Sequence, residues 1–268
     1  MVEQLLNSRQ IAAWQPRDLS EIHACDPAKK LLSDHAASDG NGPNVLVIGP
    51  PGTGKTTLLQ AYVRALMCPQ RYGEPVRHCG QCSACLSFDA HVGDAGIFAA
   101  MRQRREDQEV LHYYPVNCGS VKQDDLRMIV EEDRRQYAGR FVIYLQEAQF
   151  LAVRKLYRGL LTVIQNEDLN ILWLADTAHP EDLDSMFLRR FTRTGTTPLS
   201  EQELALFLAD RCRQWAIAVD DPRTLAMLSQ QCRGMISESI RVLAQATLGR
   251  ERTLTRQLVE HYPFLPPS

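Results

Sequence analysis

The stretch VLVIGPPGTGKTT, residues 45–57, decides the fold of this chain. It begins with an uninterrupted apolar run, which is typical of a central strand in a parallel sheet. The run leads into the pattern G-x-x-x-x-G-K-[ST], and apolar residues at helical spacing follow from 55 to 67. Glycines let main-chain amides face phosphate oxygens, and the amino end of a helix favours anions. The sequence therefore predicts a site for ATP and Mg²⁺.

Within this loop, Lys55 is expected to reach the β- and γ-phosphates, and Thr56 to ligate Mg²⁺. The residues expected to line the phosphate site are Gly49, Pro50, Pro51, Gly52, Thr53, Gly54, Lys55, Thr56 and Thr57.

Outward from the loop, apolar runs alternate with helical patterns, which predicts an α/β domain with a parallel sheet. The expected strands are 45–49, 109–117, 141–145 and 169–176, and the expected helices are 25–37, 55–67, 123–136 and 150–165. Asp26 is the expected amino-terminal cap of the first helix. A capping box, Ser200 with Glu203, then opens a series of helical patterns. The expected later helices are 221–232, 235–248 and 253–261. We therefore expect an α/β nucleotide-binding domain at 1–198 and a small all-helical domain at 199–268.

Four of the eight cysteines crowd together, as one cysteine and then C-x-x-C-x-x-C. Thiolates this close can supply the tetrahedral sulfur set that structural zinc prefers. The expected zinc ligands, in a module at 68–85, are Cys68, Cys79, Cys82 and Cys85. His78 could replace one of them, and His91 is a weaker substitute. An iron–sulfur cluster is the other chemistry compatible with this spacing.

The bulk composition excludes little. Net charge is −2 over 268 residues, so any nucleic-acid binding must come from a local patch. The short charged runs at 101–107 and 131–136 are expected to be solvated helix or loop faces, or else arginines on a DNA-facing surface. No apolar run is long enough to span a bilayer and the start lacks a signal sequence, so a cytoplasmic location is expected.

A phosphate loop with a four-cysteine module after its helix resembles the AAA+ subunits of the bacterial DNA polymerase III clamp loader, gamma/tau and delta-prime, which are related to replication factor C. The resemblance implies a parallel five-stranded AAA+ sheet, an inserted zinc module and a helical lid. WQPRDLSEI (14–22) is similar to the family's adenine-pocket box. Trp14, Pro16 and Ile22 fit that box, whereas Gln15 stands where the family has arginine.

Three further positions follow from the resemblance. Thr177 corresponds to the family's sensor threonine, and Arg190 in FLRRF (187–191) to the arginine that reaches a neighbouring subunit's ATP site. Ser237 stands where the lid arginine is expected, with Arg241 one turn on as a conceivable substitute. The chain stops at Ser268, before the place of the family's collar domain, so a collarless relative is expected.

The family's two strand-end acids correspond to Gln146 and Glu147. Glu147 is suited to polarise the attacking water. Gln146 brings no charge to the Mg²⁺ waters, so hydrolysis is expected to be slower, by about two to three powers of ten at comparable sites. The other reading is that Gln146 has no effect because Thr56 suffices. On the first reading, the expected catalytic residues are Lys55, Glu147, Thr177 and Arg190.

The resemblance thus implies an ATP-binding switch that acts on DNA in an oligomer, either with itself or with other AAA+ subunits. Possible partners are a sliding clamp or other replication or mobile-element proteins. Two alternatives stay open. One is a non-hydrolysing, nucleotide-stabilised structural subunit, similar to a stator. The other is a regulator of a mobile element, a defence system or helicase loading.

Overall fold

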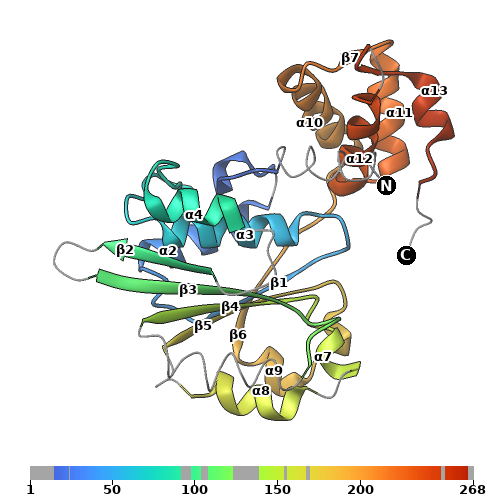
Figure 1. Cartoon of the computed structure of the whole chain (residues 1–268). Helices are drawn as coiled ribbons and strands as arrows, with labels where there is room; N and C mark the ends of the chain where they lie inside the picture. The colour runs from blue at the N-terminus through green and yellow to red at the C-terminus, as the bar shows by residue number, and fades with distance from the viewer. Residues whose placement is uncertain are drawn as a thin grey trace. The chain divides into compact units, whose positions relative to one another are not determined.

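The computed structural model describes residues 15–23, 25–91, 98–103, 108–122, 139–153, 156–166, 170–248 and 251–264. They fall into two compact units (Figure 1). The first, called the sheet unit here, comprises Arg17–Gly49 and Lys55–Thr196. The second, the C-terminal unit, comprises Thr197–Ser268 together with Met1–Pro16 and the loop Pro50–Gly54.

The sheet unit is built on a six-stranded sheet in the order β2-β3-β4-β5-β1-β6. Its strands are β1 Asn44–Ile48, β2 Phe98–Gln103, β3 Gln108–Asn117, β4 Arg140–Gln146, β5 Ile171–Thr177 and β6 Phe191–Gly195. The five strands from β3 to β6 in this order pair in parallel, which confirms the predicted parallel sheet. Strand β6 was not among the expected strands, and neither was the edge strand β2. Strand β2 pairs antiparallel with β3 and takes up the start of the charged run at 101–107, which was expected to be a helix or loop face.

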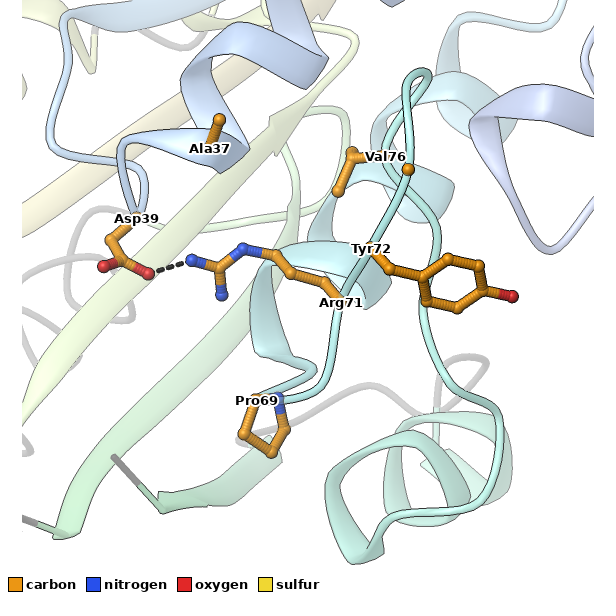
Figure 2. A pocket seen from close by; sticks show the side chains of 7 residues that line it. Ala37, Asp39, Pro69, Arg71, Tyr72 and Val76 are labelled. Carbon is orange, nitrogen blue, oxygen red and sulfur yellow. Dashed lines mark hydrogen bonds and ion pairs between the residues drawn. The ribbon is translucent and has the colours of Figure 1, made fainter. Parts of the chain in front are cut away.

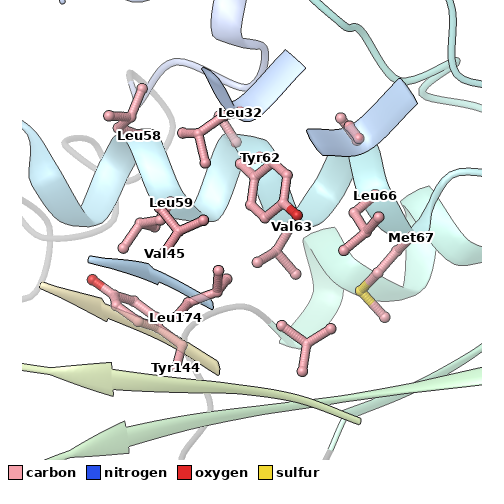
Figure 3. Packing of buried hydrophobic residues seen from close by; sticks show 14 of the residues in the cluster. Leu32, Val45, Leu58, Leu59, Tyr62, Val63, Leu66, Met67, Tyr144 and Leu174 are labelled. Carbon is pink, nitrogen blue, oxygen red and sulfur yellow. The ribbon is translucent and has the colours of Figure 1, made fainter. Parts of the chain in front are cut away.

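Helices cover both faces of this sheet (Figure 1). On one face lie α2 Asp26–Ala37, α3 Lys55–Met67 and α4 Ser83–His91; on the other lie α7 Phe150–Val153, α8 Tyr157–Ile164 and α9 Ser185–Leu188. Each face has its own buried apolar cluster. Figure 3 shows the cluster beneath α3, in which Leu59, Tyr62 and Val63 of the helix pack towards Val45, Tyr144 and Leu174 of the strands.

The alternation of side chains along a strand decides to which face of the sheet the last residues of β4 and β5 point. Successive side chains of a strand point to opposite faces. On β5, Leu172 and Leu174 belong to the α3-side cluster, while Trp173 and Ala175 belong to the opposite one. The next residue, Asp176, therefore returns to the α3 face, at the carboxyl end of its strand. The same alternation on β4, with Tyr144 on the α3 side, places Gln146 on that face too.

Two helix predictions need correction. Cys25, in a left-handed conformation with φ 61°, is the cap residue of α2, and Asp26 is the first helical residue, with Pro27 in the first turn. The side chain of Asp26 instead pairs with Lys29 at 2.7 Å. The single helix expected at 150–165 is two helices, α7 and α8. The predicted helix at 123–136 lies outside the described residues.

The C-terminal unit contains the predicted run of helices. They are α10 Glu201–Gln214, α11 Pro222–Cys232, α12 Ile236–Ala246 and α13 Arg256–His261. The Ser200–Glu203 capping box is present in both directions, as predicted. The unit is not all-helical, because β7 Ala218–Val219 and β8 Thr253–Leu254 form a short parallel pair. Among the described residues, no helix is long and apolar enough to cross a membrane.

Candidate nucleotide site and cysteine centre

The phosphate loop leaves β1 at Gly49, where no larger residue fits. The Gly49 amide donates to the Thr177 carbonyl at 3.1 Å, and a Cβ on Gly49 would lie 2.2 Å from Thr196 Oγ1. Further along the loop, Gly52 and Gly54 have φ angles of 77° and 90°, which side chains disfavour. The glycines of the motif therefore set the loop's path, as predicted from the sequence.

The Lys55 ammonium group lies folded back on the loop. Its Nζ donates to the Gly49 carbonyl at 2.8 Å. Burial lowers the pKa of Lys55, and the negative charges of Asp176 and Glu147 oppose that effect. Two carboxylates thus share the surroundings of this lysine, although the sequence analysis placed only Glu147 there.

Asp176 is the residue that the sequence analysis missed. It is 2% exposed, at the end of β5 next to β1 in the sheet. The Thr56 hydroxyl donates to Asp176 Oδ2 at 3.3 Å, the Glu147 amide donates to Oδ1 at 2.8 Å, and the Tyr144 hydroxyl also donates to Oδ2. The available signal was an acid ending an apolar strand. The sequence alone does not show that β5 pairs with β1, which brings Asp176 next to Thr56.

Gln146 and Glu147 end β4 as expected. Gln146 is half-buried and lies opposite Asn117 of β3 in the parallel register. Glu147 is exposed and its backbone is left-handed, with φ 53°. Such a conformation is uncommon for a residue other than glycine and tends to occur at functional sites. In this conformation the Glu147 amide donates to Asp176 Oδ1.

Thr177 is fully buried and engaged on the other side of the strand. Its hydroxyl donates to Gln149 Oε1 at 2.8 Å and accepts from the His179 amide at 3.0 Å. Of the adenine-box residues, Ile22 packs against the α3-side cluster and Pro16 is half-buried. Trp14 lies outside the described residues.

Arg190 lies at the opposite end of β1 from the phosphate loop. It immediately precedes β6, and its carbonyl accepts from the side chain of Asn44, the first residue of β1. The strand between Asn44 and Ile48 measures about 13 Å at about 3.3 Å per residue. The Arg190 side chain is exposed. The sheet thus separates this arginine from Lys55 and Thr56 of the same chain.

The four predicted cysteines form one cluster. Among the described residues this is a group suited to a metal ion, with all four sulfur atoms within 4.8 Å of one another. Cys82 Sγ lies 3.9 Å from Cys68 Sγ and 3.4 Å from Cys85 Sγ. Zn–S bonds of about 2.3 Å would place tetrahedral sulfurs about 3.8 Å apart. The amides of Cys79 and Cys82 donate to the sulfurs of Cys68 and Cys79, which suits thiolates.

These distances fit a single ion. A four-iron cluster binds each cysteine to a different iron, which spreads the sulfurs further apart. His78 is not part of the sulfur set: its Nε2 lies 3.4 Å from Asp18 Oδ1, and its amide donates to the same carboxylate. The His91 side chain is outside the described atoms. The residues present therefore fit a zinc ion held by four cysteines.

A hollow of about 350 Å³ lies beside this module (Figure 2). Arg71 extends across it and forms an ion pair with Asp39, while its Nε donates to the Ala36 carbonyl at 3.0 Å. The guanidinium is thus occupied by partners within the chain. The Arg71 side chain therefore connects the end of α2 to the cysteine module across this hollow.

Comparison with known proteins agrees with this geometry. The profile of the ATPase family associated with various cellular activities (AAA) matches residues 45–199. The chain belongs to the AAA family. Replication factor C small subunit 2 of Pyrobaculum islandicum is 28% identical over 160 residues, which span 57% of this chain and 44% of that protein. This chain therefore matches less than half the length of that relative.

Solved structures show the same AAA fold. A variant of RuvB from Thermotoga maritima has a TM-score of 0.61 and 18% identity, over 92% of this chain and 70% of that one. RuvB from the same organism, a Holliday junction branch migration motor, has a TM-score of 0.60 and 18% identity, over 92% of this chain and 70% of that one.

Proposed function

We propose that this AAA protein is an ATP-dependent switch of the clamp-loader type, which acts on DNA in an oligomer and hydrolyses ATP slowly. The observation that carries the proposal is the separation of Arg190 from the phosphate loop. Lys55 and Thr56 begin the helix after β1, whereas Arg190 lies beside the first residue of β1. An exposed arginine at that end cannot serve its own nucleotide site and is available to a neighbouring subunit.

The residues of the loop fit ATP with Mg²⁺. Lys55 would hold the β- and γ-phosphates, the loop amides would bind their oxygens, and Thr56 would hold the metal. When bound, Mg²⁺ would neutralise phosphate charge. Glu147 would orient the attacking water, and Arg190 of the next subunit would stabilise charge on the transferred phosphoryl group. We attribute slow hydrolysis to the neutral Gln146.

The kind of substrate rests on the relatives. A replication factor C subunit and a Holliday junction branch migration motor are both similar to this chain. Fold similarity at 18% identity does not fix function, so DNA binding and assembly with other subunits are part of the proposal.

Mixed variants test the arrangement. Lys55→Ala and Arg190→Ala are each expected to abolish ATP turnover, since trans arginines contribute about 10³–10⁵-fold. At equal mixing, about one quarter of random subunit interfaces combine an intact loop with an intact arginine, so about that share of activity returns. Arg189→Ala, which alters the exposed neighbouring arginine, is the matched control and should retain wild-type turnover. All rates are compared with and without DNA.

Three outcomes decide between functions. Arg190→Ala at the wild-type rate, or a mixture that stays inactive, contradicts the shared site. Wild-type turnover equal to that of Lys55→Ala contradicts hydrolysis. If Gln146→Asp also restores no turnover while ATP still binds, the half-exposed Gln146 would mark the non-hydrolysing structural subunit instead.

A further inference from the structure

We propose that Asp176 supplies the metal-directed carboxylate of the nucleotide site, in place of the acid that the chain lacks at Gln146. The inference rests on the proposed binding of ATP with Mg²⁺ and concerns a residue on a different strand, β5. It makes Asp176 a positioning residue for the metal, with Thr56 as the side chain that contacts the ion.

The first step is the contact with Thr56. The Thr56 hydroxyl donates its hydrogen to Asp176 Oδ2 at 3.3 Å. A hydroxyl whose hydrogen is directed at a carboxylate can still offer its oxygen to a cation, although the Tyr144 hydroxyl also contacts Thr56. Mg²⁺ is usually held by few protein oxygens and keeps several waters, so an acid next to the ligating hydroxyl can accept hydrogen bonds from those waters. Asp176 is in that position.

The second step is orientation. Three donors converge on the Asp176 carboxylate: the Thr56 hydroxyl, the Tyr144 hydroxyl and the Glu147 amide. A buried carboxylate is costly unless such donors satisfy it. The Tyr144 and Glu147 donors come from β4 and the residue after it, so the neighbouring strand fixes the carboxylate on the α3 face. The carboxylate is thus held in place by these donors before any ligand binds.

The third step is charge. With Gln146 neutral, the negative charges described near Lys55 are those of Asp176 and Glu147, which both act on the pKa of Lys55. Glu147 is exposed and suited to water activation. Asp176, at 2% exposure, is the carboxylate in contact with the metal-binding hydroxyl. A simpler role would be that of a counter-ion for Lys55 alone, and the two roles respond differently to metal.

The test measures ATP affinity by calorimetry, with EDTA and then with Mg²⁺, alongside Mn²⁺ binding to the protein–ATP complex by electron paramagnetic resonance. We expect Asp176→Asn to bind ATP in EDTA as tightly as wild type or tighter, because a negative charge near the triphosphate is gone. With Mg²⁺, the gain in affinity should fall about 10-fold or more, as when outer-shell metal partners are removed. Asp184→Asn, the same change at the α9 cap, should leave both affinities unchanged.

The outcomes separate this inference from the proposed function. Wild-type protein that binds no ATP contradicts the proposed function. If wild type binds ATP and Asp176→Asn shows the full wild-type increase in ATP affinity on adding Mg²⁺, the role of Asp176 is overturned. Equal weakening with and without metal identifies a purely structural or counter-ion role and also overturns it. If Asp176→Asn does not fold by circular dichroism, Asp176→Glu keeps the charge but moves it. For Asp176→Glu, the increase in ATP affinity on adding Mg²⁺ should then be about threefold or more smaller than for wild type. An unchanged increase overturns the role of Asp176 in metal binding.

Discussion

The main-chain amide of Glu147 donates to Asp176 Oδ1 at 2.8 Å, joining the residue after β4 to the end of β5. The bond is made with Glu147 in a left-handed backbone conformation, φ 53°. The residue proposed to activate water and the residue proposed to position the metal are therefore held by one local conformation. Any change at Asp176 should also be felt by the backbone of Glu147.

Loss of the Tyr144 hydroxyl should weaken this arrangement. Tyr144 is fully buried, and its hydroxyl donates to Asp176. Tyr144→Phe keeps the ring and leaves the carboxylate with one donor fewer, so we expect the free energy of unfolding to fall by about 1–2 kcal/mol. Urea unfolding measures this. Tyr72→Phe, at a ring that is 57% exposed, is the control and should change nothing measurable.

Gly49 should not tolerate alanine. Its added Cβ would lie 2.2 Å from Thr196 Oγ1 and 2.5 Å from the Thr196 carbonyl oxygen. Either β6 or the loop must shift, at a cost of about 2–3 kcal/mol, and ATP binding should be lost with it. Thermal unfolding and calorimetry with ATP report both effects.

Gly159→Ala is the matched control for Gly49→Ala. It lies in α8, and no atom lies within 4 Å of its would-be Cβ. Alanine there should stabilise the protein by about 0.5–1 kcal/mol through helix propensity. A stable, ATP-binding Gly49→Ala protein would show that the loop can be rebuilt around a side chain.

Local patterns predicted much of this structure. The phosphate loop, the cysteine set and the Ser200–Glu203 box each depend on residues near one another in the chain, and each is present. Four of the five parallel strands were predicted because buried strands have continuous apolar runs. Strand β6, FTRTG, was not predicted, because it has no such run. Strand β2, FAAMRQ, was missed because it shows neither a continuous run of β-branched or aromatic residues nor a clear alternation.

Asp176 was missed for a different reason. Its partners, Thr56 and Glu147, are far away in the sequence and meet it only because β5 lies between β4 and β1. Residue types at the end of an apolar run do not reveal which strand is the neighbour. Thr177, the position that the family resemblance singles out, is the residue directly after this acid.

The cysteine cluster should hold one zinc ion per chain and stabilise the fold. Removing the metal with a chelator should lower the melting temperature by roughly 5–10 °C, because the module joins α3 to α4. Cys82→Ser should have the same effect and abolish zinc binding in elemental analysis. Cys25→Ser, outside the cluster, should bind zinc as wild type does. Iron in place of zinc, or a chelator without effect, would contradict the structural zinc.

His35 should make stability depend on pH. Its Nδ1 lies 2.5 Å from the Tyr62 hydroxyl and its Nε2 lies 3.1 Å from the Pro43 carbonyl. Burial lowers the pKa of His35 below 6.5, with the Arg140 charge adding to the effect and the carbonyls of Pro43 and Gly42 opposing it. Below 6.5 the unfolded chain therefore binds a proton that the folded chain does not.

The stabilisation is complete above that value and is lost as pH falls towards the folded pKa. Wild type should thus lose more free energy of unfolding than His35→Gln between about pH 7.5 and about pH 5.5. Urea titrations at each pH measure the difference. The pKa of His78 is lowered too, but His78 is present in both proteins, so the comparison isolates His35. Parallel pH profiles for the two proteins would show that the buried imidazole accepts its proton without cost to the fold.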